Sequence, residues 1–270
     1  MGILNVTPDS FAETSRTLEP TAAVEAALRL EEDGADLIDI GGESTRPGAD
    51  LVSVDEELRR VLPVIERLAG RLRIDISVDT YKAPVAAEAV AAGAAVVNDT
   101  RGLRDDRSLA EAIAASGAAL VLMHSRGTAK TMAESAAYRD LVGEVVGELR
   151  QSVGRAVAAG IALERIIVDP GVGFAKRPEH SYGVLAKLPE VIARLGRPVL
   201  VGVSRKSFMR EALAGAPAAR RDWGTAAAVT AAVLGGAHIV RVHAVREMVQ
   251  VVRVAEQIRS VGRSAVDQQL

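Results

Sequence analysis

The sequence predicts an α/β protein with a single (β/α)8 TIM barrel spanning residues 1–270. Eight short runs rich in β-branched residues alternate with longer stretches of helical periodicity, and this alternation is typical of a parallel sheet with right-handed crossovers. The chain has 270 residues, of which 49% are hydrophobic and only 3% aromatic. Such a composition predicts a core of Ala, Val, Leu and Ile, which suits a parallel sheet wrapped by helices.

The predicted strands and helices follow one another along the whole chain. The strands are expected at residues 2–6, 36–40, 74–78, 95–98, 119–123, 166–169, 199–203 and 238–242. The helices are expected at residues 20–33, 54–68, 84–92, 141–159, 179–195, 225–234 and 246–258. Glycine just past a helix is a common C-terminal cap. Gly-Ala pairs stand directly before predicted strands at residues 34–35, 93–94, 117–118 and 236–237.

The composition excludes several classes of protein. The formal net charge is -2 and the pI is about 6.2, so no basic excess indicates a nucleic-acid partner. The chain has no cysteine, which excludes disulfides and thiolate metal sites. No stretch is apolar for long enough to span a membrane, and the N-terminal run is too short for a signal peptide. We therefore expect a cytoplasmic protein.

Polar side chains stand at the carboxyl end of every predicted strand. Barrel enzymes carry their active sites at this end. One such residue alone would more often cap a turn, but eight polar strand ends at one mouth predict a site there. These residues are Asn5, Asp39, Glu43, Asp79, Asn98, Asp99, His124, Asp169, Ser204, Arg205, Lys206, Arg241 and His243.

The last predicted strand places two cationic or proton-donating groups on one face. Side chains alternate across a strand, so Arg241 and His243 share a face while His238 points to the other. Such a pair suits an anion, for example a phosphate. A metal site built on histidine is less favoured, because the four histidines show no HExxH spacing.

Eight motifs occur in a specific order: MGILNVTPDSF, DIGGESTRPGA, ISVDTYK, VND, LMH, DPGVGF, VGVSRKSF and RVH. Together they resemble the dihydropteroate synthases, folate-pathway enzymes of the pterin-binding barrel family, from residue 1 to about residue 258. The resemblance implies an SN1-like substitution. In it, 6-hydroxymethyl-7,8-dihydropterin diphosphate reacts with 4-aminobenzoate to give 7,8-dihydropteroate and diphosphate.

The resemblance also implies the site residues. The pterin would be bound by Asp79, Asn98, Asp169 and Lys206. The diphosphate would be bound by Asn5, Thr45, Arg241 and His243, with Asn5 as the protein ligand of Mg2+. The aminobenzoate would be bound by Phe11, Thr45, Arg46, Pro47, Lys206 and Ser207. Catalysis would depend on Asn5, Lys206, Arg241 and His243.

Two loops would act as mobile lids in this family, at residues 7–11 and 44–48. Their closure would exclude water from a cationic intermediate. Ser207 is expected to open a helix whose N-terminus holds the aminobenzoate carboxylate. The resemblance further implies a homodimer.

The sequence departs from the family pattern in four places. Residues 12–14 replace the usual Ser-Asp-Gly, Ala175 stands where glycine is usual, and Thr100 replaces an aliphatic residue. Ala244 replaces the aspartate that follows the histidine of the last strand. Two alternatives remain open, a pterin-binding methyltransferase and a non-catalytic pterin-binding homologue.

Overall fold

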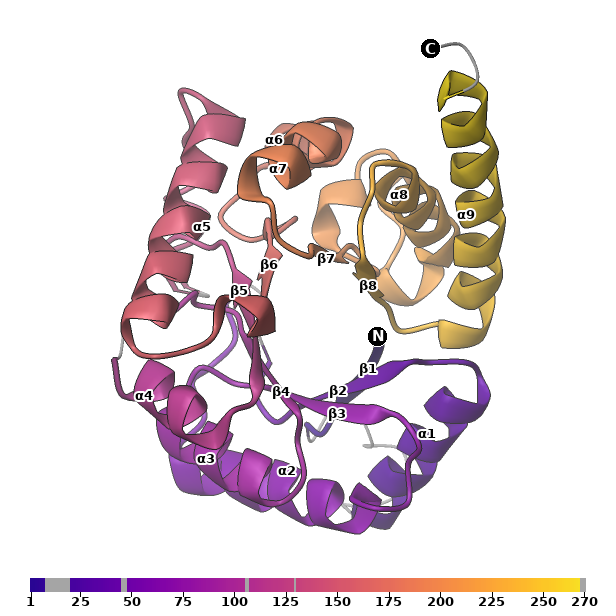
Figure 1. Cartoon of the computed structure of the whole chain (residues 1–270). Helices are drawn as coiled ribbons and strands as arrows, with labels where there is room; N and C mark the ends of the chain where they lie inside the picture. Colours follow the sequence, from indigo (N-terminus) through magenta and orange to yellow (C-terminus); the bar gives the residue numbers. More distant parts are fainter. Residues whose placement is uncertain (8–19, 45–47, 105–106, 129, 268–270) are drawn as a thin grey trace.

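Parallel strands lie at the centre of the molecule and helices surround them (Figure 1). The computed structural model describes residues 1–7, 20–44, 48–104, 107–128 and 130–267. Its strands are β1 Gly2–Asn5, β2 Leu37–Gly41, β3 Asp75–Asp79, β4 Val96–Asp99, β5 Ala119–Met123, β6 Ile166–Asp169, β7 Leu200–Gly202 and β8 Ile239–Arg241. The predicted strands are therefore all present, although β7 and β8 are shorter than the five residues expected.

The strands close into a ring. Strands β1 to β6 pair in chain order as one parallel sheet, and β7 pairs with β8. Single bridges connect the two sheets, because Val168 lies opposite Val199 and Gly2 lies opposite Val242. A 3.0 Å hydrogen bond from the Ile3 amide to the Val242 carbonyl strengthens the second junction. The carboxyl ends of all eight strands thus meet at one mouth, as the barrel prediction requires.

The helices form the outer layer of the barrel. They are α1 Pro20–Glu32, α2 Val54–Leu68, α3 Ala83–Ala91, α4 Arg107–Ser116, α5 Leu141–Ala158, α6 Pro178–Ala186, α7 Leu188–Leu195, α8 Asp222–Leu234 and α9 Val245–Asp267. Helix α4 was not predicted. The single helix expected at residues 179–195 is two helices, which meet at Lys187. Pro189 explains the break, since it has no amide hydrogen to donate to the carbonyl four residues earlier and its ring clashes with that carbonyl, whereas it is tolerated in the first turn of α7.

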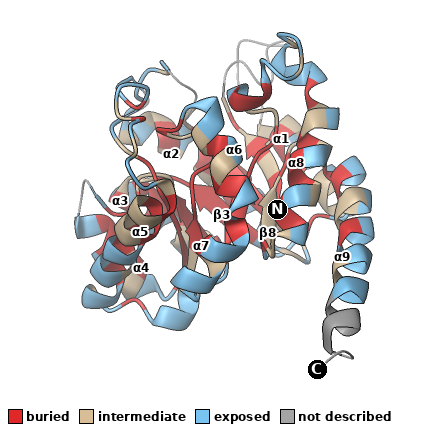
Figure 2. Ribbon diagram, turned by 90° about the horizontal axis from the view of Figure 1, so that it is seen from above, coloured by how far each residue is buried: buried red, intermediate tan, exposed pale blue. Residues whose placement is uncertain are grey.

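The two largest hydrophobic clusters of the described residues lie on opposite faces of the strands. Outward-facing side chains such as Ile38 and Ile40 are fully buried between the strands and the helices, where the buried residues of Figure 2 concentrate. A smaller cluster fills the inside of the ring and includes Val96 and Ile239. Two positions further along the same strands, the inward residues are Asn98 and Arg241. The inside of the ring therefore changes from apolar to polar toward the carboxyl ends.

No helix in the described ranges is long and apolar enough to cross a membrane. This observation agrees with the hydropathy of the sequence.

The loop after β6 contains left-handed backbone at Gly171, Gly173 and Ala175, whose φ angles are 68°, 81° and 45°. A glycine adopts this conformation without strain, whereas in an alanine the Cβ comes too close to the following carbonyl oxygen. Ala175 is one of the expected departures from the family pattern, and the left-handed backbone gives a physical reason why a glycine would suit this position. This loop carries Asp169 at its start, so its shape matters for the mouth of the barrel.

We expect Gly171→Ala to destabilise the protein far more than Gly196→Ala. Both glycines are left-handed, with φ of 68° and 61°, so both variants lose about 1–2 kcal/mol to backbone strain. A Cβ on Gly171 would lie 1.9 Å from the His124 carbonyl oxygen, whereas a Cβ on Gly196 meets nothing within 4 Å. Overpacking should therefore cost Gly171→Ala roughly 1–3 kcal/mol more. Urea unfolding measures the difference, and equal losses for the two variants would contradict the contact.

Candidate active site

The register of the first four strands places three predicted site residues close to one another. Asn5 pairs with Gly41, Gly41 pairs with Asp79, and Asp79 pairs with Asn98. These positions form one row across the inner face of the sheet at its carboxyl end. A Cβ built on Gly41 would lie 3.4 Å from the Asp79 Cβ, so the glycine leaves space beside this carboxylate.

Asp39 lies one layer below this row and is the centre of a buried hydrogen-bond network. Its Oδ1 accepts a hydrogen bond from Ser77 Oγ at 2.6 Å, and its Oδ2 accepts one from Asn98 Nδ2 at 2.9 Å. Asp39 was predicted among the polar strand ends of the mouth but was given no role in binding a substrate. A carboxylate inside an apolar strand, on the same face as Gly41, was the available signal.

Arg241 connects the last strand to the second and third strands across the ring. Its Nε donates to Asp39 Oδ2 at 2.6 Å, and its Nη2 donates to Asp79 Oδ2 at 2.9 Å. The Arg241 side chain is 18% exposed, and those of Asp39 and Asp79 are 0% and 8% exposed. Buried charges of this kind are tolerated only when they are paired and hydrogen-bonded.

Two carboxylates therefore share one guanidinium group. Burial raises the pKa of Asp79 to about 7, Arg241 opposes this shift, and the neighbouring Asp39 adds to it. The charged form of Asp79 is thus poorly stabilised by the protein alone. A ligand that brings hydrogen-bond donors to Asp79 would favour its charged form.

Asp169 and Lys206 form the opposite side of the mouth. Asp169 Oδ1 accepts the Gly171 amide hydrogen at 2.7 Å, and Lys206 Nζ donates to the Val172 carbonyl at 2.6 Å. The Lys206 ammonium also lies 4.4 Å from the centre of the Phe174 ring. Burial raises the pKa of Asp169, which Lys206 opposes, and burial lowers the pKa of Lys206 to about 8.

A second lysine, which is itself part of the loop after β6, stabilises that loop by contacting its backbone. Lys176 is buried, and its Nζ lies 2.8 Å from His124 Nδ1 and 3.2 Å from the Phe174 carbonyl oxygen. Burial lowers the pKa of Lys176 to about 7 and that of His124 to about 4. His124 Nε2 lies 3.1 Å from Glu148 Oε2, but the two are not aligned for a hydrogen bond. His124 thus follows β5 as predicted, where it supports the loop.

His243 contacts Ser204 from the neighbouring strand end. Its Nδ1 lies 2.9 Å from Ser204 Oγ, and its backbone amide donates to the same oxygen at 3.1 Å. His238 lies at the other end of the barrel, where its Nδ1 accepts the Val199 amide hydrogen at 3.1 Å. The prediction that His238 points away from His243 is confirmed.

Part of the predicted aminobenzoate site lies outside the described residues. This applies to Phe11, Thr45, Arg46 and Pro47, and to most of the two predicted lids. Ser207 is exposed, and the helix expected to open there is only a three-residue 3-10 turn, Ser207–Met209. The longer helix predicted at this position is therefore absent, whereas the contact of Ser207 with aminobenzoate stays a prediction.

Two other polar strand-end residues shape loops. Asp99 accepts the backbone amides of Arg101 at 2.8 Å and Leu103 at 2.6 Å, and so it fixes the turn after β4. Glu43 accepts hydrogen bonds from Lys82 Nζ at 2.6 Å and from a tyrosine hydroxyl. These contacts anchor the loops that follow β2 and β3.

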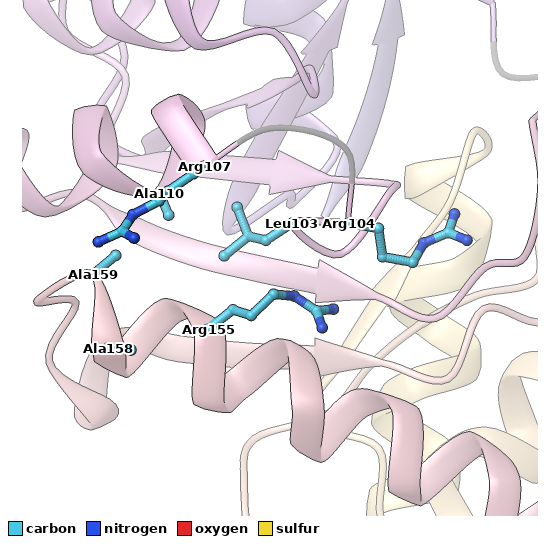
Figure 3. Close-up of a pocket in the computed structure, with 7 residues that line it drawn as sticks. All are labelled: Leu103, Arg104, Arg107, Ala110, Arg155, Ala158 and Ala159. Atoms are coloured by element: carbon cyan, nitrogen blue, oxygen red, sulfur yellow. The ribbon is translucent and has the colours of Figure 1, made fainter.

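A cavity of about 300 Å³ lies away from the mouth, between α4 and α5. Its lining consists of Leu103, Arg104, Arg107, Ala110, Arg155, Ala158 and Ala159. Figure 3 shows that the Arg107 side chain extends away from those of Arg104 and Arg155. Arg155 is bonded to the Gly102 carbonyl and to Ser152, and Arg107 to Glu111. These arginines do not converge on one ligand, so this cavity is not a second site.

Comparison with known proteins shows which family the chain belongs to. The pterin binding enzyme family matches residues 1–243. Dihydropteroate synthase of Escherichia coli strain K12 is 46% identical over 256 residues, which are 95% of this chain and 90% of that protein. A crystal structure of Yersinia pestis dihydropteroate synthase with a sulfonamide drug complex superposes with a TM-score of 0.90. That structure is 45% identical, and the match covers 96% of this chain and 94% of the Yersinia chain.

Two structures of Xanthomonas albilineans dihydropteroate synthase match similarly. One is with 4-aminobenzoic acid, at a TM-score of 0.89 and 44% identity. The other is in complex with 7,8-dihydropteroate, at a TM-score of 0.86 and 41% identity. Both matches cover 96% of this chain and 92% of the Xanthomonas chain. With the matched family spanning residues 1–243 and the barrel mouth as described, this chain belongs to the pterin binding enzymes.

Proposed function

We propose that this chain is a dihydropteroate synthase, a transferase of folate biosynthesis. It joins a dihydropterin diphosphate to 4-aminobenzoate and releases diphosphate. One observation carries the proposal: four polar side chains lie together at the barrel mouth, namely Asp79, Asn98, Asp169 and Lys206. The relatives described above are dihydropteroate synthases, which favours this function over the methyltransferase alternative. The non-catalytic alternative is left to the activity test.

The pterin ring has adjacent hydrogen-bond donors and acceptors on its aminopyrimidinone edge. In the proposed complex, the Asp169 carboxylate accepts from the ring NH and NH2 groups, and Lys206 donates to a ring acceptor. The Gly171 amide holds Asp169 Oδ1 in place, and the Val172 carbonyl holds the Lys206 ammonium. Asn98 is fixed by Asp39, and Asp79 by Arg241. These side chains are therefore positioned before the substrate binds.

The departing diphosphate needs positive charge and hydrogen-bond donors. Arg241 and His243 supply them in this proposal, from the strand end that faces the pterin residues. Much of the barrier reduction would come from groups fixed toward developing charge, which lose little energy to reorganisation. No side-chain nucleophile is required by this substitution.

Mg2+ is proposed as the cofactor, with Asn5 as its protein ligand. The described residues include no cluster of three His, Asp or Glu side chains able to hold a metal ion. In that part of the chain the Asn5 side chain has no hydrogen-bond partner, so its amide oxygen is available. This donor set fits Mg2+, which prefers oxygen, keeps several waters and binds substrate phosphates. When bound, the ion would neutralise diphosphate charge.

Several further assignments stay predictions. They are the contacts of Phe11, Thr45, Arg46, Pro47 and Ser207 with aminobenzoate, the contact of Thr45 with diphosphate, a homodimer, a cytoplasmic location and one domain over residues 1–270. The single ring of strands supports the one-domain assignment. Exposed apolar residues on α9, namely Val254 and Ile258, offer surface for a partner subunit.

The purified protein with Mg2+ should convert the pterin diphosphate and 4-aminobenzoate into dihydropteroate. Coupled detection of diphosphate release measures the rate, and chromatography identifies the product. A reaction without aminobenzoate is the control for simple hydrolysis. Folded protein that makes no product at any Mg2+ concentration would exclude the enzyme.

Asp169→Asn should weaken pterin binding by roughly 1.5–3 kcal/mol, the contribution of a hydrogen bond to a charged group. The substitution keeps the shape of the side chain but replaces an acceptor with a donor. Isothermal calorimetry with a pterin measures the change. Asp75→Asn is the matched control, because Asp75 is exposed at the opposite end of β3. Unchanged affinity for Asp169→Asn would remove this residue from the site.

Lys206→Met should flatten the dependence of stability on pH. The folded-state pKa of Lys206, about 8, lies below the ordinary value of 10.5. Between these values the unfolded chain binds more protons than the folded chain, so the free energy of unfolding rises with pH. Urea unfolding from about pH 7.5 to about pH 10 should show a smaller rise in the variant. Lys187→Met, at an exposed helix junction, is the control. Parallel curves for Lys206→Met and the unaltered protein would show that Lys206 does not titrate in this range.

A further inference from the structure

Ser204 is a buried serine at the end of β7 whose hydroxyl faces His243. The side-chain oxygen lies 2.9 Å from His243 Nδ1 and accepts the His243 backbone amide hydrogen at 3.1 Å. The residue is 6% exposed. We propose that Ser204 is a positioning residue that holds the neutral His243 ring in the tautomer with its proton on Nε2. The catalytic meaning of this tautomer rests on the function proposed above.

The hydrogen-bonding capacity of a hydroxyl selects the tautomer. A serine hydroxyl has one hydrogen to donate and two lone pairs. The His243 backbone amide can only donate, so it occupies one lone pair. If Nδ1 also donated, the buried hydroxyl hydrogen would need another acceptor, and the described residues provide none. Ser204 therefore donates to an unprotonated Nδ1, and the ring hydrogen of neutral His243 is on Nε2.

The backbone around Ser204 is held from the opposite direction by α8. Arg205 has a left-handed φ of 58°, and its side chain pairs with Asp222 at 2.7 Å and 2.9 Å. Its amide donates to Thr225 Oγ1 at 3.0 Å, and its carbonyl accepts from Arg221 Nη1 at 3.0 Å. Because both the amide and the carbonyl of Arg205 are hydrogen-bonded, the turn is fixed and the Ser204 hydroxyl is held in place before a ligand binds.

The tautomer determines what His243 offers to an anion. With hydrogen on Nε2, the neutral ring donates a hydrogen bond to a diphosphate oxygen. With hydrogen on Nδ1, the ring would present a lone pair to that oxygen instead. Arg241 already pairs with Asp39 and Asp79, so a second donor matters at this mouth.

Nitrogen NMR on protein with 15N-labelled histidine tests the assignment without any substrate. The spectrum is recorded at a pH where His243 is neutral, and His243→Gln identifies its signals among those of the four histidines. We expect Nε2 to have the shift of a protonated nitrogen and Nδ1 that of an unprotonated one. A hydrogen on Nδ1 in the unaltered protein would overturn the proposal.

Variants then test whether Ser204 is the cause. Ser204→Ala should give averaged shifts from both tautomers and lower kcat about tenfold or more, while Ser204→Thr keeps the hydroxyl and should restore both. Ser152→Ala removes another buried hydroxyl, in α5, and should change neither. A folded Ser204→Ala variant that keeps the His243 spectrum of the unaltered protein would contradict the positioning role of Ser204. If the spectra behave as expected but the unaltered protein makes no dihydropteroate, the tautomer assignment stands and the proposed function fails.

Discussion

The contacts of Arg241 with Asp39 and Asp79 hold the mouth of this barrel in one arrangement. They join β8 to β2 and β3 across the ring, and Asp39 extends the network to Ser77 and Asn98. Buried charges are costly unless they are paired, so loss of one partner leaves an uncompensated charge rather than a missing contact. The positions of the residues that face the pterin in our proposal therefore depend on this network.

The mouth combines preorganised donors with groups whose charges are poorly stabilised. The pKa of Asp79 is raised to about 7 and that of Lys206 is lowered to about 8, both through burial. Shifts of this kind cluster at functional sites, because a ligand can supply the charges and hydrogen bonds that the protein alone does not give to these groups. The loop that follows Asp169 is held by two lysines, because Lys206 donates to the Val172 carbonyl and Lys176 to the Phe174 carbonyl.

Local patterns predicted the strands well and the helices less completely. Every predicted strand is present, because short runs of β-branched and other apolar residues recur between longer helical stretches along the chain. Helix α4 was missed although Gly117 marks its end, and Pro189 was not used as a break between α6 and α7. The predicted helix at Ser207 was wrong, since the left-handed Arg205 and its contacts with α8 leave only a short turn there.

The sequence by itself determined the barrel, the polar end of the barrel and the family, because these depend on periodicity and on motifs that are contiguous in the chain. Only the tertiary structure showed that Arg241 pairs with Asp39, and that Ser204 rather than residue 244 contacts the His243 ring. Arg241 and Asp39 are 202 positions apart, and Ser204 and His243 are 39 apart. Closure of the ring brings such residues together, and no local pattern encodes which side chains then meet.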